Sequence, residues 1–384
     1  MTIPLRCLNR SSFVYAVLGC SLVLLTSCIA GTGLVSSLGV IAGRGGPTLP
    51  TEAIDTLFMS NDPQLQLEKY CGVKRETVDG IVWRYQGNVL GSTKGMFSSE
   101  PEMMKGDIAI PETLDGVTIV AIGPHYFMQC TNLTSVTVPD SIRSIGEMAF
   151  SQCESLASVH LSHNLASIGA HAFSGCKSLE SVQIPPAVQS VGEGAFCHCK
   201  MLAVIDLPQN VVHIGKGAFQ GCSGLASVAI PKGVKVLEDN TFSGCFGLVA
   251  VSLPEGLVRI GDSAFHSPLP SQNCADIRAV KLPSTLVTIG ESAFSGCSGL
   301  TKIVIPDNVT TIGNYAFNDC SSLKTTYIGK KVARLGTGAF RHTGLTHVYV
   351  ADGASVTLDD LHRAGIAEDC EVYRIYPDRR TERL

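Results

Sequence analysis

Apolar and polar residues alternate in short runs that recur along most of the chain. In Ser135–Pro139 ("SVTVP") and Ser181–Pro185 ("SVQIP") every second residue is apolar and a proline ends the run. This alternation is typical of a half-buried strand. A second apolar pair, such as Ile142 and Ile145, follows before Gly146 and predicts another short extended segment. The pattern therefore predicts two short strands per repeat, with their apolar residues facing inward.

The repeated pattern has a fixed length, which one phenylalanine per repeat marks. Eight of the nine intervals between successive markers are 23 residues, and the ninth is 29 because it contains six extra residues near 267–277. The markers are Phe127, Phe150, Phe173, Phe196, Phe219, Phe242, Phe265, Phe294, Phe317 and Phe340. A period of this kind is typical of a solenoid, in which each repeat is one coil and stacking buries a shared apolar face. We therefore predict a repeat solenoid, α/β-type to mainly β, of about ten 23-residue coils over residues 108–350.

All coils but one also carry a glycine shortly before the marker phenylalanine. Gly146, for example, precedes Ala149, Phe150 and Cys153, which we expect to form a compact and partly helical arc. Nine coils have this glycine, so the position needs either a positive φ or room for close backbone contact. Glu238 stands there in one coil, and we predict that its turn differs locally.

These repeated phrases carry a family resemblance. "IGEMAFSQCESL" (145–156), "IGAHAFSGCKSL" (168–179) and "IGESAFSGCSGL" (289–300) are flanked by V-x-I-P or L-P. They resemble the Treponema pallidum-type, or BspA-like, leucine-rich repeats, and the resemblance covers about residues 108–350. It implies a curved, right-handed solenoid, a surface or periplasmic location, and binding of proteins rather than catalysis. The chain departs from the family pattern between Phe265 and Phe294, where the cysteine register fails.

Eight of the fifteen cysteines occupy one position of the coil, so stacking must place them in a column. They are Cys130, Cys153, Cys176, Cys199, Cys222, Cys245, Cys297 and Cys320. A buried thiol behaves as a small hydrophobe with a weak donor and can face backbone carbonyls. Disulfides between rungs have a suitable Cα separation but an unfavourable torsion, and one thiol per coil lacks the ligand cluster of a zinc site. We predict a structural column without metal, and we interpret Cys197 as a spare cysteine beside it.

The N-terminus has the features of an export signal. Arg6 and Arg10 precede an apolar run, 13–25, which is shorter than a membrane-spanning helix but suits a signal peptide. The segment 25–28, "LTSC", resembles the lipobox of bacterial lipoproteins. This resemblance implies cleavage before Cys28 and lipidation of its thiol and amine. An ordinary secretory signal and a transmembrane anchor remain the alternatives.

We therefore divide the N-terminal part into a lipoprotein signal peptide (1–27) and a tether rich in Gly, Ser and Thr (28–50). Several acyl chains would anchor the protein firmly, at about 0.8 kcal/mol per buried CH₂. Ile29, rather than Asp, after the lipidated cysteine implies sorting to an outer membrane if the source has one.

The ends of a solenoid need caps, because the terminal coils would otherwise expose their apolar faces and strand edges. We predict an N-terminal cap at 51–107 with a helix at Glu52–Phe58 and strands in Gly80–Leu90, "GIVWRYQGNVL". We predict a C-terminal cap and tail at 351–384. The cap has a helix in "LDDLHRAGI" (358–366) and a strand in "CEVYRIY" (370–376), and the basic tail Arg379–Leu384 is frayed.

Composition and motifs exclude several classes of function. Only 16% of residues are charged, the net charge is −4 and the pI is about 6.2, which argues against nucleic-acid binding. The chain has no G-x-S-x-G, H-E-x-x-H, P-loop or dinucleotide motif. His160, His163 and His171 fall at different points of two coils and do not form a ligand set. We predict no enzyme activity and no cofactor, and an enzyme with a site in the cap or the insertion is the last alternative.

The outward strand positions change in character along the chain. In the N-terminal half they are mostly small, whereas the C-terminal half gathers one group of larger residues: Lys281, Lys302, Lys324, Tyr327, His347 and Tyr349. Tyrosine is enriched at protein interfaces because it buries a large area and keeps a polar group. The alternative is that strand propensity alone places tyrosines there. We predict that these six residues bind a ligand.

These observations predict a lipid-anchored leucine-rich repeat protein of a bacterial cell envelope, placed in the outer membrane. Its partner would be a protein of the host matrix or of the bacterial envelope, and adhesion is the version that the family resemblance implies. The alternative is a structural envelope scaffold or a self-assembling component without a host ligand, which is compatible with a homo-oligomer.

Overall fold

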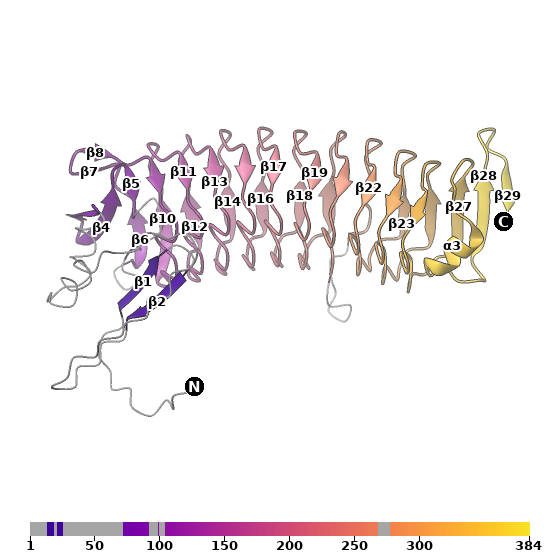
Figure 1. Ribbon diagram of the computed structural model, residues 1–384, viewed down its shortest axis with the longest axis horizontal. Coiled ribbons are helices and arrows are strands. Elements are labelled where there is room, and N and C mark those ends of the chain that lie inside the picture. Colours follow the sequence, from indigo (N-terminus) through magenta and orange to yellow (C-terminus); the bar gives the residue numbers. More distant parts are fainter. Residues whose placement is uncertain (1–13, 19–20, 26–71, 92–98, 100–103, 268–276) are drawn as a thin grey trace, which may run out of the picture.

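The repeated coils lie side by side in an elongated solenoid (Figure 1). The structure is a computed structural model that describes residues 14–18, 21–25, 72–91, 99, 104–267 and 277–384. It contains about 11 turns of about 23 residues and very little helix. The predicted solenoid is therefore confirmed, and its composition is mainly β.

The first strand of each coil contributes to one side of the solenoid, which we name the first-strand face. Its strands are β6 (Gly106–Ala109), β10 (Leu133–Thr137), β12 (Ser158–His160), β14 (Ser181–Gln183), β16 (Val204–Asp206), β18 (Ser227–Ala229), β20 (Ala250–Ser252), β23 (Lys302–Val304), β25 (Thr325–Ile328) and β27 (His347–Ala351). They form three successive sheets in which these strands pair in parallel, and Ser135 lies opposite Ser158, 23 residues later. Val136 and Val138 are buried and Thr137 is exposed, as the alternation predicts.

The second strand of each coil forms the other side, the second-strand face. Its strands are β5 (Val89–Leu90), β9 (Ala121–Ile122), β11 (Ser144–Ile145), β13 (Ser167–Ile168), β15 (Ser190–Val191), β17 (His213–Ile214), β19 (Val236–Leu237), β21 (Arg259–Ile260), β22 (Thr288–Ile289), β24 (Thr311–Ile312) and β26 (Arg334–Leu335). Ile145 lies opposite Ile122 on one side and Ile168 on the other. The same inward position therefore forms a continuous apolar row.

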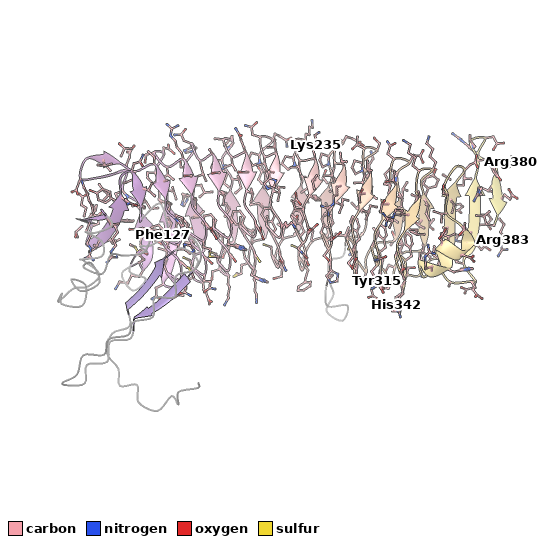
Figure 2. All side chains as sticks on the ribbon, viewed as in Figure 1. Phe127, Lys235, Tyr315, His342, Arg380 and Arg383 are labelled. Carbon is pink, nitrogen blue, oxygen red and sulfur yellow. The ribbon has the colours of Figure 1, made fainter. Side chains whose placement is uncertain are left out.

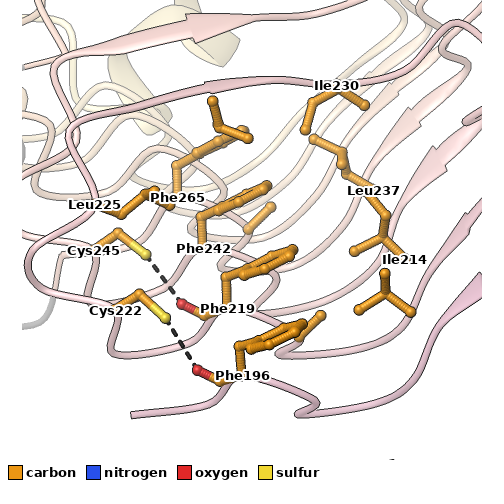
Figure 3. Packing of buried hydrophobic residues seen from close by; sticks show 14 of the residues in the cluster. Phe196, Ile214, Phe219, Cys222, Leu225, Ile230, Leu237, Phe242, Cys245 and Phe265 are labelled. Atoms are coloured by element: carbon orange, nitrogen blue, oxygen red, sulfur yellow. Dashed lines mark hydrogen bonds between the residues drawn. The ribbon is translucent and has the colours of Figure 1, made fainter. Parts of the chain in front are cut away.

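The marker phenylalanines form a continuous stack inside the solenoid. From Phe127 to Phe340, adjacent ring centroids are 4.8–5.6 Å apart and the rings are within 15° of parallel. Figure 3 shows part of this stack, beside a row of buried aliphatic residues. Phe265 and Phe294 stack at 5.1 Å, so the six-residue insertion between them does not interrupt the core.

The arc that carries each phenylalanine is a series of turns and not a partial helix. Two positions in nearly every arc adopt a positive φ, for example Met148 (51°) and Gln152 (61°). A positive φ is incompatible with a right-handed helix. Every second main-chain N–H group of the arc bonds to the neighbouring coil, as in Phe150 N to Ala172 O at 2.7 Å, and the N–H groups between them close turns with the carbonyl three residues earlier, as in Cys153 N to Phe150 O at 3.3 Å. The predicted partial helix is therefore wrong, because positive-φ residues separate the turns and alternate N–H groups pair with the next coil.

The coil glycine is needed because the backbones of adjacent coils approach closely. A Cβ at Gly192 would lie 2.5 Å from the carbonyl carbon of Gly169 and 2.6 Å from the nitrogen of Ala170. The φ angle of Gly192 is not positive. Of the two explanations that the sequence offers, crowding is therefore the one that applies at this position.

Glu238 interrupts the second-strand face, as its substitution for this glycine predicts. The sheet that runs from the N-terminal end stops at β17, and a separate sheet begins at β19. In the preceding coil, Gly215 N donates to Val191 O at 2.9 Å, and a Cβ there would lie 2.5 Å from the nitrogen of Glu193. A glutamate cannot approach that closely, so the ladder breaks at this coil while the phenylalanine stack continues at 5.4 Å.

The N-terminal strands extend the second-strand face. β3 (Lys74–Val78) and β4 (Ile81–Gln86) pair antiparallel, and β4 pairs with β5. Trp83 is buried and its ring meets Phe127 edge-on at 6.3 Å. β7 (Thr113–Leu114) and β8 (Val117–Thr118) form a small separate hairpin.

Other features predicted near the N-terminus are described only in part. β1 (Val14–Leu18) and β2 (Ser21–Leu25) pair antiparallel within the apolar run. The helix predicted at Glu52–Phe58, the tether and Cys28 lie outside the described residues. No helix in the described part of the chain has the length and apolar character needed to cross a bilayer.

The C-terminal end adds a helix and two strands. The predicted helix is α3 (Leu358–Arg363), which begins at the N-cap Thr357 with a capping box. The predicted strand is β28 (Glu371–Ile375), which pairs in parallel with β27. The prediction of a frayed tail is wrong, because β29 (Thr381–Arg383) pairs antiparallel with β28 and covers its open edge.

One inward position carries a residue that does not suit the core. Thr326 is fully buried between Ile303 and Val348 of the neighbouring strands, and its Oγ1 has no hydrogen-bond partner. We expect Thr326→Val to raise the free energy of unfolding by about 1 kcal/mol, because it removes an unsatisfied hydroxyl at nearly constant volume. Urea unfolding measures the change. Thr325→Val, on the outward side, is the control, and a less stable Thr326→Val protein would contradict the explanation.

Candidate protein-binding face

The structure places the cysteine column inside the arc, against the main chain of the preceding coil. All eight thiols are free and buried. The Sγ of Cys222 donates to Phe196 O and that of Cys245 to Phe219 O, each at 3.1 Å (Figure 3). The same contact recurs at five further rungs, with Sγ–O distances of 3.0–3.6 Å. At the first rung, the Sγ of Cys130 lies 3.3 Å from Ser99 Oγ.

Burial also suppresses the chemistry of these thiols. It raises the pKa of Cys176, Cys245 and Cys297 to about 12, so they stay protonated at neutral pH. The thiolate is the nucleophile and the metal ligand, and a protonated thiol serves poorly as either. Among the described residues no group of three or more His, Cys, Asp or Glu could hold a metal ion. The column thus contacts carbonyls and fills space.

Tyrosines line up on the first-strand face near its C-terminal end. Tyr327 of β25 lies opposite Tyr349 of β27, which lies opposite Tyr373 of β28. The Tyr349 and Tyr373 rings stack at 5.7 Å and 21°, and the His347 ring lies 6.4 Å from that of Tyr349. We call Tyr327, Tyr349 and Tyr373 the tyrosine ladder. The three tyrosine side chains are half-buried and point outward, because the residue before each of them in its strand is buried in the core.

Acidic side chains hold the edges of this ladder. The hydroxyl of Tyr373 donates to Glu371 Oε2 at 2.8 Å, and Glu371 also lies 3.3 Å from Nε2 of His347. The Tyr327 hydroxyl donates to Asp307 at 3.5 Å. Burial and the Asp307 carboxylate raise the pKa of Tyr327, so its phenol stays neutral and remains a donor. The ladder is therefore a neutral aromatic surface with oriented hydroxyl groups.

The predicted lysines lie on the same face, beside the ladder. Lys281, Lys302 and Lys324 are exposed, and none makes an ion pair with a described residue. Lys302 precedes Val304, which lies opposite Tyr327, and Lys324 precedes the strand that holds Tyr327. The structure therefore brings the six predicted residues onto one surface.

The predicted set of ligand-binding residues left out three members of this surface. Tyr373 was assigned only to a cap strand, although the alternation of "CEVYRIY" already turns it outward with Glu371. Val304, 47% exposed, and Arg278, also exposed, belong to the outward columns as well. Beyond the ladder, Arg380 lies over the ring of Tyr376 at 4.7 Å, at the C-terminal end of the solenoid (Figure 2).

A shallow cavity of about 450 Å³ lies elsewhere, between the second-strand face and α3. Its charged lining residues are Asp262, Glu291, Arg334, Asp360 and Arg363. Hydrogen bonds from Thr357 and the charge of Arg363 hold the pKa of Asp360 below its usual value. A carboxylate with a lowered pKa is a weak base, so Asp360 does not suit proton abstraction.

Parallel coils, an inward row of leucines and valines, and an outward strand face define a leucine-rich repeat solenoid. The family model described as "BspA type Leucine rich repeat region (6 copies)" matches residues 120–249 and 239–359. The chain belongs to this family. No curated protein matches the chain.

Solved leucine-rich repeat structures are similar to this chain. The T. pallidum protein TpLRR is 28% identical, with a TM-score of 0.44 over 60% of this chain and 88% of that one. A leucine-rich repeat protein from Bacteroides ovatus is 22% identical, with a TM-score of 0.37 over 79% and 98%. The pneumococcal vaccine antigen PcpA is 20% identical, with a TM-score of 0.42 over 78% and 93%.

Proposed function

We propose that this chain is a lipid-anchored protein of a bacterial cell envelope that binds a protein ligand through the tyrosine ladder and its neighbouring lysines. The ladder carries the proposal, because it gathers Tyr327, Tyr349 and Tyr373 on one exposed strand face. Binding hot spots are enriched in Tyr and Arg and lie in the centre of an interface. Membership of a leucine-rich repeat family supports protein binding over catalysis.

The two residue types on this face would contribute differently to binding. A tyrosine buries a large area at a low entropy cost and can keep a hydrogen bond at its hydroxyl. The exposed lysines would speed encounter with a partner and make binding sensitive to salt. We therefore assign affinity mainly to the ladder and association rate mainly to Lys281, Lys302 and Lys324.

The paired variant Tyr327→Ala with Tyr349→Ala tests the ladder. One truncation at a hot spot removes at least about 2 kcal/mol, or ~30-fold in affinity, and we expect the pair to weaken binding of the captured ligand by at least that factor. The measurement is quantitative capture from envelope and host-matrix extracts, followed by titration of the captured protein. Circular dichroism checks that the fold is intact.

The matched control is Thr137→Ala with Ser158→Ala, at the small outward positions of the N-terminal half. We expect it to leave binding unchanged. Equal losses from both pairs, or none from the tyrosine pair, would show that the ladder is ordinary strand surface.

Anchoring is tested at Cys28. We expect Cys28→Ser to abolish acylation and to move the protein from the membrane fraction to the soluble fraction, because no acyl chain would then hold it. Fractionation without detergent, with metabolic labelling by a fatty acid, measures both effects. Unchanged membrane attachment of the variant would refute the lipoprotein assignment.

Exposure at the cell surface decides between adhesion and a role inside the envelope. We expect protease added to intact cells to cleave the chain if it binds host proteins. Full protection on intact cells, with cleavage after the outer membrane is opened, would assign the ligand to the envelope itself.

A further inference from the structure

The two halves of the first-strand face differ in charge. In the six coils from Thr134 to Ser252, the outward positions carry the acids Glu180 and Asp206 and no Lys or Arg. In the next four coils, from Arg278 to Tyr349, the outward positions carry no Asp or Glu and one group of cations: Arg278, Lys281, Lys302 and Lys324. We name these four coils the cationic half.

Some cations elsewhere on the described solenoid are held in ion pairs between coils, whereas the lysines and the arginine of the cationic half are not. Ion pairs between coils join Lys177 to Glu154 at 2.8 Å and Lys216 to Asp239 at 3.2 Å. Arg278, Lys281, Lys302 and Lys324 make no ion pair within the described residues. A group of like charges on a rigid face raises the local potential and attracts an anionic partner.

The three lysines also run diagonally across the strands. Lys281 occupies the coil position of Val304, 23 residues earlier, and Lys302 stands two residues before Val304 on the next coil. On the following coil, Lys324 stands one residue before Thr325, the residue that pairs with Lys302. With coils about 4.8 Å apart and about 3.3 Å per strand residue, successive lysine Cα atoms are about 8 Å and about 6 Å apart. Alternate residues of an extended chain are about 6.6 Å apart on one side. The diagonal therefore matches side chains at alternate positions of an extended peptide.

The ladder lies next to this diagonal. Val304, Tyr327 and Tyr349 continue the outward column in which Lys281 stands. Rings and an exposed valine beside the cations offer an apolar contact to the remaining side chains of a bound segment. A flexible polyanion that lacks apolar side chains between its charges would make no apolar contact with these rings.

We propose that the occupant of the cationic half is an extended protein segment with carboxylates at alternate positions, an inference that rests on the proposed function. Each carboxylate would meet one lysine of the diagonal, and the segment would lie against Tyr327 and Tyr349. The partner of this chain would therefore be a protein that presents such an acidic extended strand or tail.

Two isomeric peptides test the spacing. The labelled probes are (Glu-Thr)₅ and Glu₅-Thr₅, which have the same composition and charge, and their affinities for the full chain are measured by fluorescence anisotropy. We expect the alternating peptide to bind at least about tenfold more tightly, because only its carboxylates match the diagonal. Equal affinity of the two isomers would overturn the proposal, since it would reflect net charge alone.

Charge reversal tests the residues. We expect Lys302→Glu with Lys324→Glu to weaken binding of the alternating peptide more than about tenfold. The matched control is Lys232→Glu with Lys235→Glu, which are exposed in the turn between β18 and β19, outside the first-strand face, with Lys235 at the upper edge in Figure 2. An equal loss in the control would overturn the assignment to the cationic half.

Other occupants give different results. Tighter binding of heparin than of the alternating peptide would identify a sulfated glycan and overturn the proposal. Self-association that Glu180→Lys abolishes would identify a second copy as the occupant and overturn the proposal, because Glu180 would then meet the cationic half of its partner.

The acidic segment and the proposed function can fail separately. If neither peptide binds while the tyrosine pair still loses its captured ligand, the acidic segment is refuted and the proposed function stands. If the alternating peptide binds but the tyrosine pair changes no capture, the proposed ladder fails instead.

Discussion

Replacing Phe196 with alanine is expected to lower the free energy of unfolding by about 3–5 kcal/mol. The ring is fully buried and stacks on Phe173 at 5.3 Å and on Phe219 at 5.6 Å. Its loss leaves a cavity between two coils that cannot close, because the coil spacing is held by the backbone ladders on either side. The expected cost is large because the phenylalanine stack is continuous through this part of the core.

Urea unfolding followed by circular dichroism measures this effect. Phe196→Leu keeps most of the volume and should cost less than the alanine variant. Val304→Ala, at a 47% exposed position, should change stability by no more than about 0.5 kcal/mol. A Phe196→Ala protein that loses less than about 1 kcal/mol would contradict the assignment of the stack as a main source of stability.

Gly192→Ala is expected to destabilise the solenoid by about 3 kcal/mol, although it adds a single methyl group. The new Cβ would lie 2.5 Å from the carbonyl carbon of Gly169 and 2.6 Å from the nitrogen of Ala170. These atoms belong to the main chain and cannot rotate away, so the two coils would have to separate. Glu238 illustrates the result, because the second-strand face is broken at its coil.

The matched control is Gly233→Ala, which makes the same chemical change outside the crowded column. Its new Cβ would meet Cγ1 of Val212 at 2.8 Å, which is a side-chain atom, and its nearest main-chain neighbour would be the oxygen of Val211 at 3.2 Å, well beyond the 2.5 Å contact at Gly192. Both variants reduce the entropy of the unfolded chain equally, so the difference between them isolates the backbone clash. Similar stabilities of the two variants would show that the coils have room to separate at little cost.

The regular part of the fold was predictable because every coil packs against a neighbour with the same pattern. Once Val136 is inward in one coil, in-register stacking places Val159 and Val182 inward in the next two, and all three are buried. The same reasoning placed Tyr327 and Tyr349 side by side, since both follow an inward residue of their strands. The break at Glu238 was also predictable, because it is the one coil in which the repeated glycine is replaced.

Features that depend on segments outside the repeat were not predictable in this way. Tyr373 joins the ladder because β28 adds a further parallel strand, and this strand lacks the Ala-Phe phrase that marks the other coils. β29 forms because it pairs with the otherwise open edge of β28, and the basic composition of the tail does not indicate this pairing. Helix propensity is also a weak guide to the arcs, because every second N–H group of an arc bonds to the next coil.

The sequence by itself determined the solenoid, its period, the inward residues, the position of the cysteines and most of the candidate binding face. These follow from one repeated pattern, since stacking makes equivalent positions neighbours. Only the tertiary structure decided that the coil glycine is crowded rather than at positive φ, that the arcs are turns, and that β28 and β29 complete the C-terminal end. Each of these depends on the distance between backbones of different coils or strands, and that distance is set by the packed side chains and ladders of the whole solenoid.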